Sequence, residues 1–412
     1  MAKIAGLSPL APSGFPVVPA IEGVDLAAGS CGIRYKGRDD LLLMRFAPGS
    51  SVAGVFTRSL TAGAPVEWCR RALGGGRARA FVVNAGNANA FTGRAGEAST
   101  RRTAAAAAEL LGCSEGEIFL ASTGVIGEPL PDQKITDFLP KLQTELAGDA
   151  WERAARAIMT TDTFPKAASR TAAIGGVSVT INGIAKGSGM IAPDMATMLA
   201  FVATDALLPH EVLQPLLARG ADRSFNSITV DGDTSTSDTV LMAASGRAGN
   251  PPVERAGDPR LRAFAKALDE VLIDLAQQVV KDGEGAEKFI TITVTGAASA
   301  AAARRIGLAI GNSPLVKTAV AGADANWGRI AMAVGKSGEK ADRDRLVIAI
   351  GGVPITENGQ RRADYDEAPV AAHMRGRDIR IAVDVGVGRS SATVWTCDLT
   401  HRYIDINADY RS

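Results

Sequence analysis

Residues 186–199 read KGSGMIAPDMATML, a run of glycines and hydroxyls that ends at an apolar stretch. Thr197 is either an ordinary β-branched residue entering a strand at Leu199, or a nucleophile that carries its own base. The second interpretation requires a cut between Ala196 and Thr197, because a cut exposes an α-amine with an unperturbed pKa of about 7.7–8.0. The Thr197 hydroxyl can make that cut by attacking the small Ala196 carbonyl if the backbone is held in strain. Both interpretations stay open on the residues alone.

The shortage of histidine favours an enzyme that needs such a base. Three residues, His210, His373 and His401, stand far apart, and none has a second His at ligand spacing. Lys plus Arg number 45 against 44 Asp plus Glu, which argues against a nucleic-acid or anionic-membrane binder driven by bulk charge. If the chain is an enzyme, we expect no His base, no bound metal and no resident cofactor.

Length and composition predict a soluble cytoplasmic protein. The 412 residues fit one large or two medium domains, and 46% hydrophobic with 22% charged residues can bury a sizeable core. No run reaches the roughly 18 apolar residues of a membrane span, and prolines interrupt any signal-peptide core near the N-terminus. The scattered cysteines predict free thiols in a reducing compartment: Cys31, Cys69, Cys113 and Cys397.

Helical and strand patterns alternate along the chain and predict an α+β architecture. The Ala-rich run 104–111, followed by Gly112, predicts a helix, and Asp258-Pro259 opens a second one with apolar residues at three- and four-residue spacing. Asn182-Gly183 predicts a hairpin turn. The strands that we expect from β-branched runs are 81–83, 177–181, 239–241, 290–294, 346–350, 379–383 and 392–395.

The sequence patterns for phosphate and calcium binding are incomplete in this chain. Gly187-Ser188-Gly189 does not continue as GxGxxG into a helix, and no GxxxxGK[ST] is present. The stretch that starts at Asp231 resembles the opening of a calcium loop, but Thr236 and Met242 stand where that loop needs Gly and Glu. We interpret it as a polar, turn-forming loop.

The segment 186–199 resembles the self-cleavage segment of the ornithine acetyltransferase family, which comprises bifunctional glutamate and amino-acid N-acetyltransferases of arginine biosynthesis. The resemblance extends over essentially the whole chain. Its other motifs follow in family order at 54–57, 83–90, 122–127, 160–163, 231–235, 283–286, 326–330 and 406–412.

The resemblance implies a layered α-β-β-α fold like that of N-terminal-nucleophile enzymes, with a mixed α/β C-terminal region. It implies self-cleavage into chains 1–196 and 197–412, which assemble as a two-plus-two heterotetramer. The acetyl group of N-acetyl-L-ornithine would pass through an acetyl-Thr197 ester to L-glutamate in a ping-pong reaction. Thr123 and Gly124 match the oxyanion hole. The residues that match the substrate-binding positions are Thr160, Lys186, Thr197, Glu284, Asn407 and Ser412.

Charge alone assigns Lys186 to the substrate carboxylate and Glu284 to the ornithine ammonium. The family position that Thr160 matches could instead correspond to its neighbour Thr161. Two other classes of function stay open: an N-terminal-nucleophile aminopeptidase or amidase that transfers to water, and an uncleaved binding protein. Whether acetyl-CoA also serves as an acetyl donor stays open as well.

Overall fold

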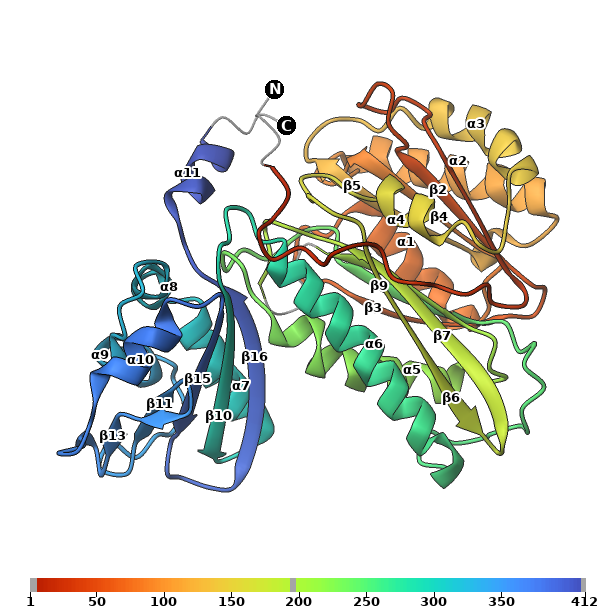
Figure 1. The fold of residues 1–412 in the computed structure, drawn as a ribbon. Helices are drawn as coiled ribbons and strands as arrows, with labels where there is room; N and C mark the ends of the chain where they lie inside the picture. The colour runs from red at the N-terminus through yellow and green to blue at the C-terminus, as the bar shows by residue number, and fades with distance from the viewer. Residues whose placement is uncertain (1–5, 193–197, 409–412) are drawn as a thin grey trace.

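The computed structural model describes residues 6–192 and 198–408 of the chain (Figure 1). Two sheets stack face to face in its larger part. The first has the order β1-β2-β4-β5, formed by Val24–Gly29, Leu41–Phe46, Ala80–Asn87 and Ile118–Val125. The second has the order β3-β9-β8-β7-β6, formed by Ser51–Phe56, Thr239–Ala244, Leu199–Thr204, Val177–Lys186 and Lys166–Ile174.

Strand β2 shows how alternation along a strand builds the layers. Leu41 and Leu43 pack toward one face with helices α2 (Gly93–Leu111) and α3 (Asp132–Thr144), while Leu42 packs toward the second sheet. The far face of the second sheet is covered by α5 (His210–Arg223) and α6 (Arg262–Lys281). The expected α-β-β-α architecture is therefore confirmed. Shorter helices and 3₁₀ turns complete this part: α1 (Ala64–Ala72), α4 (Trp151–Ala157), η1 (Leu73–Gly75), η2 (Glu115–Glu117), η3 (Phe225–Ser227) and η4 (Pro259–Leu261).

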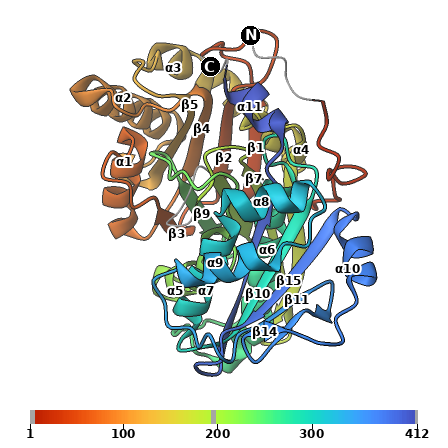
Figure 2. The same ribbon diagram turned by 90° about the vertical axis from the view of Figure 1, so that its left-hand side faces the viewer.

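A smaller mixed α/β unit forms the C-terminal region, as expected. Its sheet has the order β12-β11-β15-β10-β16, formed by Val353–Pro354, Val347–Ile350, Asp378–Asp384, Phe289–Ala297 and Ser390–Cys397. Helices α8 and α9 lie on the side that faces away from the sandwich (Figures 1 and 2). The other elements of the region are α7 (Ala300–Gly311), α8 (Pro314–Ala321), α9 (Trp327–Gly335), α10 (Glu367–Met374), α11 (His401–Asn407), β13 (Thr356–Glu357) and β14 (Gln360–Arg361).

The expected strands and both expected helices are present. The Ala-rich run is the second half of α2, which ends at Gly112 in the left-handed region with φ +62°. Asp258 accepts a hydrogen bond from the backbone N–H of Arg260 and caps a 3₁₀ turn that leads directly into α6. The four cysteines are free thiols, and in the described ranges no helix has the length and apolarity needed to cross a membrane.

The predicted hairpin at Asn182-Gly183 is wrong, because both residues lie inside β7. The turn between β6 and β7 is Gly175-Gly176, whose φ values of +60° and +87° suit a two-residue hairpin loop. Gly183 is needed for packing instead: a Cβ there would lie 2.8 Å from the Leu275 side chain of α6. Tertiary contacts therefore override a dipeptide that is common in turns.

The second sheet contains strands from both sides of the predicted cleavage site. Strands β3, β6 and β7 precede residue 196, whereas β8 and β9 follow it. Antiparallel pairing of β7 with β8 sets Lys186 opposite Leu199. The predicted cut at 196/197 would consequently fall between two paired neighbours of one sheet.

Candidate active site

The predicted oxyanion residues lie at the end of β5, where it runs parallel to β4. Thr123 is buried. Gly124 has φ +132°, and a Cβ on it would lie 2.3 Å from the carbonyl carbon of Gly86 in β4. Only glycine fits here, because the two backbones approach too closely for a side chain. The close approach holds Thr123 and Gly124 firmly against the neighbouring strand.

Lys186 joins the two sheets at this end of the sandwich. It is the last residue of β7, and its Nζ donates a hydrogen bond to Thr123 Oγ1 at 3.3 Å. The side chain is buried, and burial lowers the pKa of Lys186, an effect that the positive charge of Lys166 reinforces. Nearby carboxylates oppose the shift, among them Asp162, Glu284 and Asp238. Lys186 therefore lies between the oxyanion residues and several acidic groups.

Glu284 and Asn407 meet although 123 positions separate them in the sequence. Asn407, the last residue of α11, donates from Nδ2 to Glu284 Oε2 at 2.8 Å. Burial raises the pKa of Glu284, and hydrogen bonds from Asn407 and Thr161 partly offset this shift. Gly189 leaves room for the carboxylate, since a Cβ there would lie 2.5 Å from it.

The two adjacent threonines have different neighbours. Thr160 donates its backbone N–H to Asp162 Oδ2 at 2.9 Å, whereas the Thr161 hydroxyl is hydrogen-bonded to Glu284. Thr161 is thus the one whose side chain contacts another predicted substrate residue. Three of the predicted positions, Ala196, Thr197 and Ser412, lie outside the described residues.

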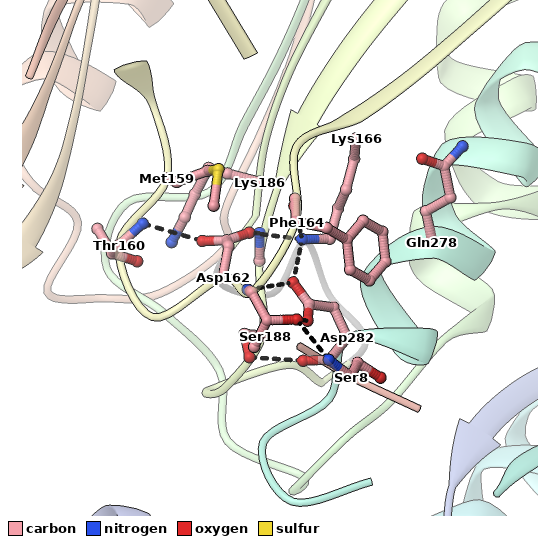
Figure 3. Close-up of polar contacts among 12 residues, drawn as sticks. Ser8, Met159, Thr160, Asp162, Phe164, Lys166, Lys186, Ser188, Gln278 and Asp282 are labelled. Carbon is pink, nitrogen blue, oxygen red and sulfur yellow. Dashed lines mark hydrogen bonds and ion pairs between the residues drawn. The ribbon is translucent and has the colours of Figure 1, made fainter. Parts of the chain in front are cut away.

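A buried ion network that sequence reasoning missed supports these loops (Figure 3). Lys166 Nζ lies 2.7 Å from Asp162 Oδ1 and 2.6 Å from Asp282 Oδ2, and all three side chains are fully buried. Burial disfavours the charged form of Asp162, but Lys166 and Lys186 outweigh it and lower the pKa of that carboxyl. Burial raises the pKa of Asp282.

The network holds three segments of the site together. Asp162 accepts the backbone N–H of Gly187 at 2.6 Å as well as that of Thr160. Ser188 Oγ donates to the Asp282 carbonyl at 2.6 Å, and Glu284 N–H donates to the Ser188 carbonyl at 3.1 Å. The segments at 160–162, 186–189 and 282–284 are therefore tied to one another. The Thr-Thr-Asp-Thr motif marked one member of the network, but nothing near Lys166 indicated a buried charge.

Two further aspartates flank the segment around Thr197. Asp238 is completely buried, and its Oδ1 accepts the backbone N–H of Met198 at 3.0 Å. Burial raises the pKa of Asp238 well above its usual range. Asp231 accepts the N–H groups of Met190 and Ile191. Both lie in the loop that was compared with a calcium site, and Asp231 also belongs to the family motif at 231–235, so the sequence carried a signal for this loop.

Across the described ranges, no cluster of three or more His, Cys, Asp or Glu side chains has the arrangement of a metal site. A cavity of about 450 Å³ lies away from these residues, between β3 and the start of α5, with Arg77, His210 and Glu254 in its wall. No predicted site residue lines it. The polar groups that the described part of the candidate site brings together are hydroxyls, a buried lysine and carboxylates.

The layered α-β-β-α fold, with hydroxyl, lysine and carboxylate groups at one end of its sheets, puts the chain in a class of proteins whose architecture resembles that of N-terminal-nucleophile enzymes. Within that class the chain belongs to the ArgJ family, whose sequence pattern matches residues 25–412.

Similar proteins carry the name "Arginine biosynthesis bifunctional protein ArgJ". The one from Agrobacterium fabrum is 60% identical over 409 residues, which cover 98% of this chain and 99% of the relative. That from Gluconobacter oxydans is 60% identical over 412 residues, covering 100% and 97% respectively. The crystal structure of the Bacillus halodurans protein of the same name is 42% identical and matches 51% of this chain and 98% of its own, with a TM-score of 0.49.

Proposed function

We propose that the chain is an acetyltransferase of arginine biosynthesis that moves the acetyl group of N-acetyl-L-ornithine to L-glutamate through an acetyl-Thr197 ester. One observation carries the proposal: Lys186 contacts Thr123 at the sheet end where β8 begins, and β8 starts two residues after Thr197. Groups that match the family's catalytic and substrate positions therefore converge from separate strands. Membership of the ArgJ family supports the same activity.

Self-cleavage comes first. The Thr197 hydroxyl oxygen attacks the Ala196 carbonyl carbon, the Ala196–Thr197 C–N bond breaks, and the proton of the hydroxyl passes to the departing nitrogen. Water then hydrolyses the resulting ester to an Ala196 carboxylate and a free Thr197 hydroxyl. The products are chains 1–196 and 197–412, which we propose to assemble as a two-plus-two heterotetramer.

Transfer follows in two half-reactions. The Thr197 α-amine takes the proton of its own hydroxyl while Oγ attacks the acetyl carbonyl of N-acetylornithine. The tetrahedral intermediate collapses, its C–N bond breaks, and ornithine leaves with that proton on its α-nitrogen. The amine of glutamate then attacks the acetyl ester, loses a proton to the Thr197 α-amine, and the Thr197 oxygen leaves and is reprotonated.

The buried contacts suit these steps. The Lys186 ammonium can only donate, so Thr123 Oγ1 is the acceptor, and the hydroxyl hydrogen of Thr123 is free to point at a developing oxyanion. Gly124 would supply its backbone N–H as the second donor. Glu284, held by Thr161 and Asn407, provides the negative charge for the distal ammonium of ornithine.

Product analysis tests the proposal. The purified protein is incubated with N-acetylornithine and glutamate, and acetylglutamate, ornithine and acetate are quantified. We expect equal amounts of acetylglutamate and ornithine and little acetate. Acetate in place of acetylglutamate would identify the aminopeptidase or amidase alternative, and a single uncut band on a denaturing gel would identify the binding protein.

Two further measurements complete the test. Incubation with N-acetylornithine alone should leave an acetyl group on the N-terminal Thr197 peptide, detected by mass spectrometry. Incubation with acetyl-CoA and glutamate alone determines whether acetyl-CoA is a second donor.

A further inference from the structure

The loop from Asp231 to Asp238 contacts the chain on both sides of the proposed cleavage site. We propose that Asp231 and Asp238 are positioning residues for self-cleavage, each fixing one end of the segment that contains Ala196 and Thr197. This inference rests on the proposed function, because it assumes that the cut occurs.

Asp231 holds the end before the cut. Its Oδ2 accepts the backbone N–H of Met190 at 2.6 Å, and its Oδ1 accepts that of Ile191 at 2.8 Å. Met190 has φ +59°, a conformation that a residue with a side chain seldom adopts, and the Asp231 hydrogen bond is directed at this residue. The Ile191 carbonyl in turn accepts the N–H of Val230 at 2.8 Å. The backbone is therefore anchored at both its N–H and carbonyl groups.

Asp238 holds the end after the cut. Its Oδ1 accepts the N–H of Met198, the residue that follows Thr197, at 3.0 Å, and the Met198 carbonyl accepts the N–H of Thr239 at 3.2 Å. Oδ2 of Asp238 is buried and has no hydrogen-bond partner among the described residues. The carboxyl thus faces the Met198 amide, with the hydroxyls of Thr57 and Ser235 beside it, and burial favours its neutral form.

Fixing both ends favours an intramolecular attack for an entropic reason. A hydroxyl reaches the preceding carbonyl only from a narrow set of backbone conformations, and holding the ends of a short segment removes most of the others. Only six residues, 192–197, separate the two anchored ends. A clamp at one end alone would leave the other end free to rotate away.

Replacement by asparagine should affect the two aspartates differently. In Asp231→Asn, the side-chain NH₂ faces one of the two backbone N–H groups that the carboxylate accepts, so one of the two hydrogen bonds at this end of the segment is lost. In Asp238→Asn, the side-chain oxygen can still accept the Met198 N–H, and the amide nitrogen takes the place of Oδ2. Asp238→Asn therefore conserves the contact, whereas Asp238→Ala removes it.

A time course of precursor cleavage measures the effect. Each variant is translated in a cell-free system, samples are quenched in detergent, and the loss of the full-length band is fitted to a rate. Asp231→Asn and Asp238→Ala should slow cleavage roughly 10- to 100-fold, the factor expected from one hydrogen bond to a charged or buried group. Asp238→Asn should stay within about 3-fold of the wild type.

Asp233→Asn is the matched control, because Asp233 lies in the same loop and is exposed. It should cleave at the wild-type rate. Each substitution is also made together with Thr197→Ala, which keeps the chain uncut, so that thermal melting reports folding separately from cleavage. If Asp231→Asn unfolds at the assay temperature, the comparison of Asp238→Asn with Asp238→Ala decides.

The outcomes separate this inference from the proposed function. A wild-type chain that never cleaves refutes the proposed function itself. A wild-type chain that cleaves, with Asp231→Asn and Asp238→Ala as fast as the control, overturns the positioning role. Equal slowing by Asp238→Asn and Asp238→Ala would overturn the hydrogen-bond role of Asp238.

Discussion

Replacement of Lys166 by Met tests the buried ion network most directly. Met keeps the apolar stem of the side chain but removes the ammonium that Asp162 and Asp282 share. Both carboxylates are fully buried, so water cannot replace the lost charge. The variant therefore leaves two buried acidic groups at the base of the site, with Lys186 still lowering the pKa of Asp162.

The size of the expected loss of stability follows from that burial. Removing one partner of a buried ion pair costs about 3–5 kcal/mol, because an uncompensated charge stays behind. For a domain of the size of the sandwich, each kcal/mol lowers Tm by about 2–4 °C. The expected decrease for Lys166→Met is therefore roughly 6–20 °C at neutral pH.

The pH dependence has a definite sign. In the wild type, Asp162 has a lowered pKa, so its contribution to stability is present above the unfolded value of about 3.9 and is lost as pH falls through the folded value. Burial already raises the pKa of Asp282 in the wild type, and without Lys166 it raises that of Asp162 above the unfolded value as well and increases the shift of Asp282. The folded variant then binds more protons than the unfolded one, and its stability falls as pH rises through that window. The deficit in Tm should be larger at pH 8 than at pH 5.

Thermal melting of both proteins across this pH range is the measurement. Lys266→Met is a suitable control, since Lys266 lies on α6, is 80% exposed and pairs with Glu270 only at 3.9 Å. Such an exposed pair contributes about 0–1 kcal/mol, so the control should lose less than about 4 °C. A deficit below about 3 °C for Lys166→Met at pH 8, or the same deficit at pH 5 and pH 8, would refute this account.

Three further substitutions address the site itself. Thr123→Ala removes one proposed oxyanion donor and should lower kcat by roughly 10²–10³-fold in steady-state assays, and an unchanged kcat would exclude that role. Gly124→Ala places a Cβ 2.3 Å from Gly86, so both transfer activity and Tm should fall, and a variant with wild-type Tm and rate would contradict the packing argument. Asn407→Ala removes a hydrogen bond to Glu284 and should lower kcat/KM for N-acetylornithine roughly 10-fold, with Asp405→Ala on the same helix as the control.

Local sequence patterns were sufficient to predict the elements whose burial and backbone geometry depend on neighbouring residues. The β-branched run 290–294 and the glycine after α2 predicted strand β10 and the end of that helix, because each signal depends on neighbours in the sequence. Asn182-Gly183 failed for the opposite reason. Its conformation depends on Leu275 of α6, 92 positions away from Gly183, and on strand pairing that no dipeptide encodes.

The candidate site likewise contains residues that the sequence identified and a residue that it missed. Thr123, Lys186, Glu284 and Asn407 were identified by resemblance to a family, but their contacts come from the fold. Lys166 was missed because Phe164-Pro165-Lys166 looks like an exposed strand start. Its partner Asp282 is 116 positions away, and only the packing of α6 against β6 brings them together.

The arrangement of the second sheet also explains how two cleaved chains could remain one enzyme. Strands β8 and β9, which follow residue 196, lie side by side between β7 and β3, which precede it. Six register pairs join β7 to β8 and six join β3 to β9. A cut at 196/197 would break one peptide bond without opening either ladder. The first of these ladders sets Leu199, two positions after the proposed cut, opposite Lys186, so one sheet would retain both fragments.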